Sequence, residues 1–160
     1  MLKKRLIPVL LLRDGQLVRG EAFSSYRVIG DPLCEVERFN QWEVDELIYL
    51  DIGGGNTGGR QDARVAVRGG ILDVLDAVAR TCFAPLTFGG GIRTVEDARE
   101  RIARGADKVT LGTAAIANPP LVAEVARVFG SQAVVVSIDA LRFPNGYTEV
   151  FARGGREPTT

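Results

Sequence analysis

Two aspartates follow largely apolar segments, where carboxylates are uncommon. Asp51 follows residues 47–50, and Asp139 follows residues 133–138. Burying a carboxylate is costly unless it is paired or has a function, and burial raises its pKa toward values suited to general acid–base catalysis. Both aspartates are therefore candidates for a catalytic or substrate-binding site. The structural alternative is that each one caps backbone N–H groups of the following loop.

Two turns rich in small residues could bind an anion such as phosphate. Residues 89–91 are three glycines that follow a predicted strand and precede a predicted helix, and residues 110–113 end the next predicted strand in the same way. Glycine lets backbone N–H groups approach an anion, and a helix N-terminus adds a positive dipole. Two neighbouring turns of this kind predict one shared phosphate site. The candidate phosphate- and substrate-binding residues are Asp51, Thr87, Gly90, Gly91, Thr110, Gly112 and Thr113.

Three charged residues stand before predicted strands, at the opposite ends from these turns. They are Arg5, Glu46 and Lys108. If their side chains face the inside of a barrel, opposite charges pair around its axis. The alternative is that they are three solvated residues outside the strands.

The composition excludes several kinds of protein. The 160 residues carry 20 Lys and Arg, 20 Asp and Glu, and no His. Balanced charge removes the main argument for a nucleic-acid partner, and the lack of His excludes Ser-His-Asp catalysis and His-containing metal sites. Cys34 and Cys82 form no CxxC motif, so we expect no metal and no cofactor, and we predict two reduced cysteines packed in the core of a cytoplasmic protein. The apolar residues 6–12 are too few for a membrane span.

Short apolar segments alternate with helical periodicity along the chain. The predicted strands are residues 6–12, 47–52, 85–88, 108–111 and 133–138. The predicted helices begin at Asp31-Pro32 and cover residues 71–79, 94–104 and 118–129. Asn145-Gly146 predicts a hairpin between residues 141–143 and 147–151. The glycines of residues 53–59 predict a mobile loop.

This alternation predicts an α/β fold with a parallel sheet and helices outside it. A doubly wound sheet and a (β/α)₈ barrel of the TIM type both fit the pattern. Eight such units need about 250 residues, so we expect about five βα units of an incomplete barrel, followed by a C-terminal β-hairpin. Residues 1–160 are expected to form this single partial barrel domain. In both architectures the site lies at the carboxyl ends of the strands.

Eight motifs spread along the chain resemble those of one known family. They include residues 4–8 (KRLIP), 50–52 (LDI), 89–92 (GGGI) and 129–136 (FGSQAVVV). In this order they are similar to the HisF family, the cyclase subunit of imidazole glycerol phosphate synthase, and they cover the first five strands of its eight-stranded barrel. The resemblance implies a lyase of histidine biosynthesis that takes ammonia from a glutaminase partner and acts on a bis-phosphorylated intermediate.

The resemblance also implies roles for individual residues. Asp139 matches one of two catalytic aspartates of the family. The other aspartate, on the first strand, is replaced by Leu11, which cannot transfer a proton. Gly91 and Thr113 match one phosphate site, in which an asparagine of the family is replaced by Gly112. The charged residues match three of the four members of the gate through which ammonia enters the family's barrel, namely Arg5, Glu46 and Lys108. This match implies a HisH-like glutaminase at the amino-terminal face.

The first strand favours one branch of the family. Residues 10–13 (LLLR) resemble a HisF-like branch encoded with surface-polysaccharide (lipopolysaccharide) genes, in which the barrel passes ammonia to a separate sugar-amidating enzyme. We therefore predict this branch, because the acid–base pair is dispensable there. The alternative is the cyclase subunit of histidine biosynthesis, and a second alternative is a non-catalytic barrel fragment or docking module.

Overall fold

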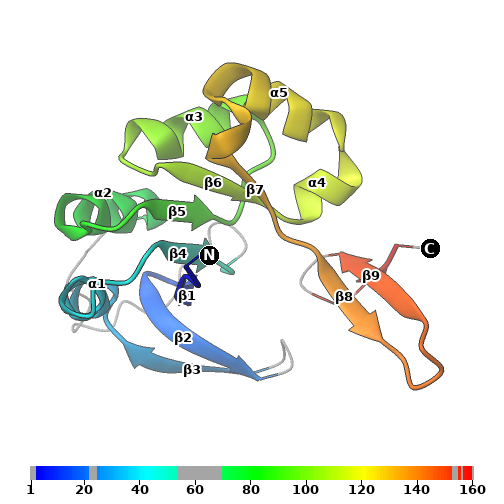
Figure 1. Cartoon of the computed structure of the whole chain (residues 1–160), viewed down its shortest axis with the longest axis horizontal. Coiled ribbons are helices and arrows are strands. Elements are labelled where there is room, and N and C mark those ends of the chain that lie inside the picture. The colour runs from blue at the N-terminus through cyan, green and yellow to red at the C-terminus, as the bar shows by residue number, and fades with distance from the viewer. Residues whose placement is uncertain (1–2, 22–24, 54–69, 153–154, 156, 160) are drawn as a thin grey trace.

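The chain forms a seven-stranded sheet with helices against it and a second sheet of three strands (Figure 1). The computed structural model describes residues 3–21, 25–53, 70–152, 155 and 157–159, so the predicted loop at 53–59 lies almost entirely outside the described residues. The larger sheet consists of β1 Val9–Arg13, β2 Gln16–Glu21, β3 Ser25–Gly30, β4 Leu47–Asp51, β5 Leu86–Gly89, β6 Lys108–Leu111 and β7 Val134–Val136. The smaller sheet consists of β8 Asp139–Arg142, β9 Thr148–Ala152 and β10 Glu157–Pro158. The helices are α1 Pro32–Gln41, α2 Ile71–Thr81, α3 Val95–Ala103, α4 Thr113–Ala117, α5 Pro120–Phe129 and the 3₁₀ helix η1 Ser131–Ala133.

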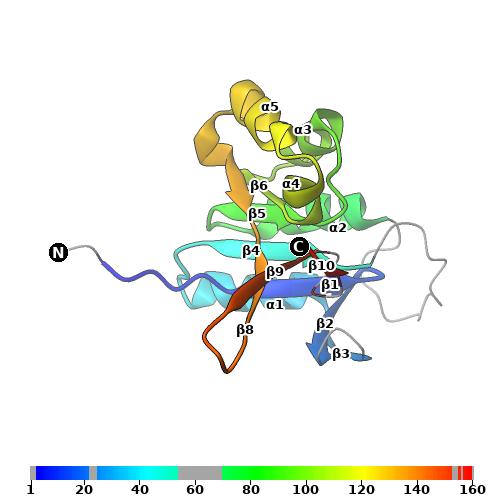
Figure 2. The ribbon, with the colours of Figure 1, turned by 90° about the vertical axis from the view of Figure 1, so that its right-hand side faces the viewer.

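The strand order identifies the larger sheet as part of a barrel. Its order is β3-β2-β1-β4-β5-β6-β7, and β1, β4, β5, β6 and β7 are parallel, each paired with the next one along the chain. A doubly wound sheet reverses its direction at a switch point, whereas a TIM barrel places each strand beside the preceding one. The order therefore confirms the incomplete (β/α)₈ prediction. Over the described residues the sheet stays open, as Figure 2 shows from the side.

One face of the parallel strands packs against the helices. Tyr49 on β4 and Phe88 on β5 stack with ring centroids 6.5 Å apart inside a cluster that also contains buried side chains of α1 and α2. A second cluster joins Val109 and Leu111 on β6 to α3 and α5. Because side chains alternate between the two faces of a strand, the residues between these point to the other face.

That other face corresponds to the inside of a barrel. By the same alternation it carries Leu11, Leu50, Thr87, Gly89 and Thr110. Its polar side chains come at two levels, because Thr87 lies near the start of β5 and Thr110 near the end of β6. The open sheet therefore has a polar amino-terminal end and a glycine-rich carboxyl-terminal end, where Leu11 and Leu50 lie in register with Gly89.

The four predicted helices form, with boundaries within two residues of the predicted ones. Asp31 caps α1 by accepting from the Leu33 N–H at 2.8 Å, and Pro32 is the first helical residue. Thr94 and Asp97 form a capping box at the start of α3, with an Asp97 N–H to Thr94 Oγ1 distance of 3.1 Å. Gly130 follows α5 with a φ of +90°, which favours glycine.

Several predicted boundaries are wrong. The first strand begins at Val9 rather than residue 6, because Leu6 lies outside the sheet and donates its N–H to Asp45 at 2.8 Å. The antiparallel hairpin of β2 and β3 was not predicted, nor was α4. The fifth parallel strand ends at Val136, so Asp139 begins β8 instead of extending that strand. The hairpin at Asn145-Gly146 is confirmed by the pairing of β8 with β9.

The cysteine prediction holds only in part. Both thiols are free, but Cys34 is exposed on α1 and Cys82 is partly buried at the end of α2. No helix among the described residues is long and apolar enough to cross a bilayer.

Candidate functional site

The turn between β5 and α3 is built so tightly that only glycine fits it. Gly90 has a φ of +101° and Gly91 has a φ of +66°. A Cβ on Gly90 would collide with the backbone carbonyl of Asp51, and a Cβ on Gly89 would lie 2.8 Å from the side chain of Leu50. The predicted anion-binding turn thus packs directly on the end of β4, and its backbone amides lie beside the N-terminus of α3.

Asp51 is the carboxylate closest to this turn. Its Oδ1 accepts a hydrogen bond from the Gly53 N–H at 2.9 Å. Burial raises the pKa of Asp51 above its ordinary value, while the Gly53 hydrogen bond and the positive charge of Arg101 act in the opposite direction. The predicted loop-capping alternative is therefore part of what Asp51 does, and its raised pKa also suits a group that handles protons.

Arg101 is a functional candidate that the sequence did not indicate. It lies on α3, is only 7% exposed, and donates from Nη2 to the carbonyl oxygen of Gly90 at 3.0 Å. Burial lowers the pKa of its guanidinium, and the charges of Asp97, Glu100 and Asp51 oppose that shift. The signal available in the sequence was an arginine three residues after Ala98, on the face of the helix that packs on the sheet.

The second predicted turn, after β6, adds a buried hydroxyl. Thr110 is 6% exposed, and its Oγ1 has no hydrogen-bond partner among the described residues. Thr110 pairs in register with Gly89, so it lies next to the glycine turn. Gly112 caps the short helix α4, which begins at Thr113. The structure therefore brings together Asp51, Gly90, Gly91 and Thr110, and it continues the chain from Thr110 through Gly112 to Thr113.

A cluster of charges occupies the amino-terminal ends of the strands. Glu46 is 5% exposed, and its Oε1 accepts a hydrogen bond from the Lys108 ammonium at 2.7 Å. The guanidinium of Arg5 lies 3.6 Å from Oε2 of the same carboxylate. The structure therefore brings the three predicted gate residues together on the inner face, and the alternative of three solvated residues is wrong for Glu46.

Thr87 belongs to this cluster in the structure. Its hydroxyl donates to Glu46 Oε1 at 3.0 Å, and the residue is fully buried. The structure thus separates Thr87 from the glycine turn with which it was grouped. Burial alone would raise the pKa of Glu46, but the hydrogen bonds from Lys108 and Thr87 and the charges of Lys108 and Arg5 outweigh burial and hold the pKa below its ordinary value.

The structure does not bring Asp139 and Leu11 together. Leu11 on β1 pairs in register with Leu50 on β4, within the larger sheet. Asp139 pairs with Phe151 in the smaller sheet. Leu11 and Leu50 therefore form an apolar pair on the inner face, at the position where the resemblance implies a catalytic aspartate.

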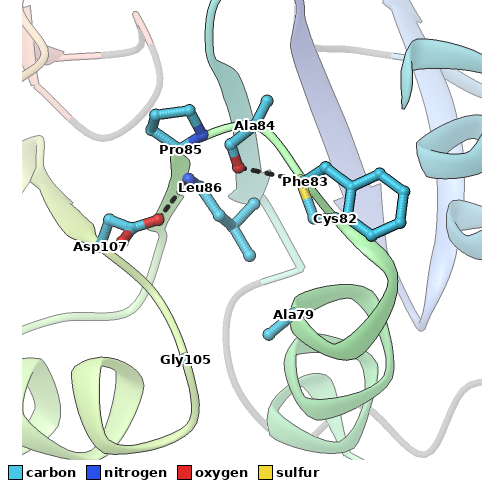
Figure 3. Close-up of a pocket in the computed structure, with 8 residues that line it drawn as sticks. All are labelled: Ala79, Cys82, Phe83, Ala84, Pro85, Leu86, Gly105 and Asp107. Atoms are coloured by element: carbon cyan, nitrogen blue, oxygen red, sulfur yellow. Dashed lines mark hydrogen bonds between the residues drawn. The ribbon is translucent and has the colours of Figure 1, made fainter. Parts of the chain in front are cut away.

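A surface cavity of about 360 Å³ lies beside the start of β5 (Figure 3). It is bounded by Cys82, whose thiol donates to the Ala84 carbonyl at 3.2 Å, and by Asp107, which accepts from the Leu86 N–H at 2.7 Å. Burial raises the pKa of the Cys82 thiol, so this cysteine is not an activated nucleophile. Phe83, which is 88% exposed, stands at its rim. The cavity lies at the start of β5, away from the glycine turn at the end of that strand.

The order of the parallel strands defines an incomplete α/β barrel, with a charged cluster at its amino-terminal end and a glycine turn at its carboxyl-terminal end. A family model described as "Histidine biosynthesis protein" matches residues 5–160, so the chain belongs to this family. The chain is 42% identical over 159 residues to the "Imidazole glycerol phosphate synthase subunit HisF" of Alkaliphilus metalliredigens (strain QYMF). This alignment covers 99% of the chain and 60% of that relative, so the chain spans well under two thirds of the relative's length.

Proposed function

We propose that this chain supplies the first five strands of a HisF-type barrel whose amino-terminal face accepts ammonia from a glutaminase partner. The first candidate for its reaction is that of imidazole glycerol phosphate synthase, because the family model and the HisF relative both point there. These comparisons favour histidine synthesis over the surface-polysaccharide branch predicted from residues 10–13.

The pairing of the buried Glu46 carboxylate with the more exposed Lys108 and Arg5 is the observation that carries the proposal. Burying charges rarely adds net stability compared with well-packed apolar residues. This cluster places Lys108 and Arg5 on a single carboxylate at the entrance to the inner face of the sheet. A paired, narrow set of charges there would admit a neutral molecule of the size of ammonia and hold back ions. A partner that makes ammonia would then bind on this face.

The opposite end of the sheet supports a phosphorylated substrate. The glycine turn, the N-terminus of α3 and the buried Thr110 hydroxyl lie together there, and these are groups that bind phosphate oxygens. Ammonia entering at Glu46 would cross the inner face to reach a substrate held at this turn. Asp51 lies beside the turn and is placed to bind that substrate.

Leu11 favours the second candidate, supply of ammonia for sugar amidation. The leucine faces the inner side of β1, where the cyclase reaction of the resembled family needs an aspartate. A barrel that only passes ammonia to another enzyme does not need that proton transfer. The gate cluster serves both candidates equally, so the gate tests the shared part of the proposal.

The test is the coupling between glutamine consumption and product formation in the reconstituted complex of full-length proteins. We expect Glu46→Ala to leave Lys108 and Arg5 as facing like charges, and to reduce the product formed per glutamine consumed. Free ammonium should still serve as the nitrogen source, because the substrate turn is untouched. The matched control is Glu96→Ala, which removes an exposed carboxylate paired with Arg99 at 3.1 Å. An unchanged ratio in Glu46→Ala would show that this cluster is not the entrance for ammonia.

A further inference from the structure

Arg101 is a buried cation on α3, on the same face of the helix as the buried Ala98. It is the seventh residue of α3, and its Nη1 donates to the Asp97 carbonyl at 2.9 Å while Nη2 donates to the Gly90 carbonyl at 3.0 Å. Its Nε has no acceptor among the described residues. A buried guanidinium that leaves one donor unsatisfied is a poor choice for stability alone. The position of this charge therefore points to a use beyond stability.

The hydrogen bond to Gly90 sets the direction of the peptide that joins Gly90 to Gly91. The carbonyl and the N–H of a trans peptide point in opposite directions. Because the Gly90 carbonyl points toward Arg101, the Gly91 N–H points away from it. Within the described residues that N–H has no backbone acceptor. A cation on the carbonyl also polarises the peptide and makes its N–H a stronger donor.

Two further groups near this peptide have hydrogen-bonding atoms without a partner among the described residues. The Thr110 hydroxyl lies on the neighbouring strand, is nine-tenths buried and has no partner among the described residues. The guanidinium itself lies beside Gly91, because its Nη2 is 3.6 Å from the point where a Gly91 Cβ would be. A donor, a hydroxyl and a cation thus converge on the turn between β5 and α3.

We propose that Arg101 is the positioning residue of the phosphate subsite, which it serves by fixing and polarising the Gly90–Gly91 peptide and by placing a positive charge behind it. The proposal rests on the proposed function, which supplies the phosphorylated substrate. The ligand class is a phosphate monoester, whose oxygens accept from the Gly91 N–H and the Thr110 hydroxyl. The arginine acts through the peptide and does not itself touch the phosphate.

The experiment is a titration of the full-length protein with inorganic phosphate, followed by the amide NMR signals of Gly90 and Gly91. We expect the wild-type signals to shift with saturation, and Arg101→Met to bind phosphate roughly tenfold more weakly, since a hydrogen bond to a charged group is lost. Arg99→Met is the matched control, because Arg99 is half-exposed on the same helix and pairs with Glu96. This control should leave the phosphate affinity unchanged.

Two further variants separate charge from packing. Arg101→Lys keeps the positive charge, whereas Arg101→Gln keeps a hydrogen-bond donor without it. We expect Arg101→Lys to retain most of the phosphate affinity and Arg101→Gln to lose it. This comparison remains available if Arg101→Met does not fold. The role of Arg101 would be overturned if all variants bound phosphate with equal affinity. It would also be overturned if Arg101→Lys and Arg101→Gln lost the same affinity, in proportion to their loss of melting temperature. Wild-type signals that do not move would overturn the phosphate subsite itself, and the Glu46 coupling test would still decide the ammonia entrance independently.

Discussion

Asp51 is the residue whose protonation the fold changes most directly at the candidate site. Burial raises its pKa above the ordinary value of 3.8, and the Gly53 N–H and Arg101 only partly offset this. The folded chain therefore binds this proton more tightly than the unfolded chain does. It follows that ionisation of Asp51 costs folding stability at neutral pH, and that the cost disappears as the pH falls below the ordinary pKa.

We expect Asp51→Asn to raise the free energy of unfolding at pH 7 relative to wild type. The amide oxygen can still accept from the Gly53 N–H, while the buried charge is gone. The gain should shrink as the pH is lowered through 3.8, because wild-type Asp51 is then neutral in both states. Urea unfolding curves at a series of pH values measure this. A loss of stability that is equal at every pH would contradict the burial argument.

Residue types alone predicted part of the site. The glycines and Asp51 were found because glycine and buried carboxylates are informative by type. Arg101 was missed because a helical arginine is usually solvated, and only the packing of α3 on the sheet shows that this one is buried. Thr87 was grouped with the wrong end of its strand, because one β-strand carries inward-facing residues at both ends.

At the scale of elements, the β5–α3 turn joins strand, glycines and helix cap into one rigid unit. Gly90 combines a positive φ with close contact to Asp51, and Gly146, in the β8–β9 hairpin, has a φ of +86° with open space around it. The two glycines therefore separate the cost of backbone strain from the cost of a steric collision.

We expect Gly146→Ala to destabilise the protein by about 1 kcal/mol, which is the lower end of the cost of a strained backbone. Gly90→Ala should cost more than about 3 kcal/mol, since the collision with Asp51 is added to the strain. It should also abolish phosphate binding at the turn. Thermal unfolding and the phosphate titration measure both effects. Equal losses in the two variants would show that the turn can relax around a side chain.

The sequence predicted the strands and helices that are marked by continuous apolar segments or by helix caps, and it missed those without such marks. Continuous apolar segments gave the parallel strands, and caps such as Asp31 and Thr94 gave the helix starts. The hairpin of β2 and β3 was missed because its apolar residues come in short pairs between charged ones, and much of β3 is exposed. β7 ends early because Ser137 is the last residue whose N–H reaches β6, and the chain then leaves for the smaller sheet.

At the scale of the whole molecule, the two ends of the inner face carry different chemistry, and Leu11 lies at the carboxyl-terminal end, in register with Leu50 and Gly89. A general acid or base contributes roughly 10²–10⁴-fold to the rate of a reaction that needs one. If the full-length protein runs the cyclase reaction, the leucine therefore limits it. If it only passes ammonia to another enzyme, the leucine has no such effect.

We expect Leu11→Asp in the full-length protein to raise the rate of imidazole glycerol phosphate formation from ammonium by roughly 10²–10⁴-fold. The restored carboxylate would lie on the inner face, next to Leu50. Formation of the product in steady state measures this, with Leu50→Asp as a control for the effect of any added charge on the inner face. A wild-type rate equal to that of Leu11→Asp would show that this position takes no part in proton transfer.

The order of strands in the larger sheet also determines how the molecule can assemble during translation. Each parallel strand from β4 to β7 pairs with the parallel strand synthesised before it, beginning with β4 on β1. Every βα unit can therefore dock as soon as it leaves the ribosome. From β4 onward the nascent sheet grows at one edge only, where its newest parallel strand is exposed, while β3 stays at the opposite edge. Unpaired edge strands attract other chains. The stage of synthesis therefore determines which strand of this protein chaperones, or neighbouring nascent chains, would encounter first.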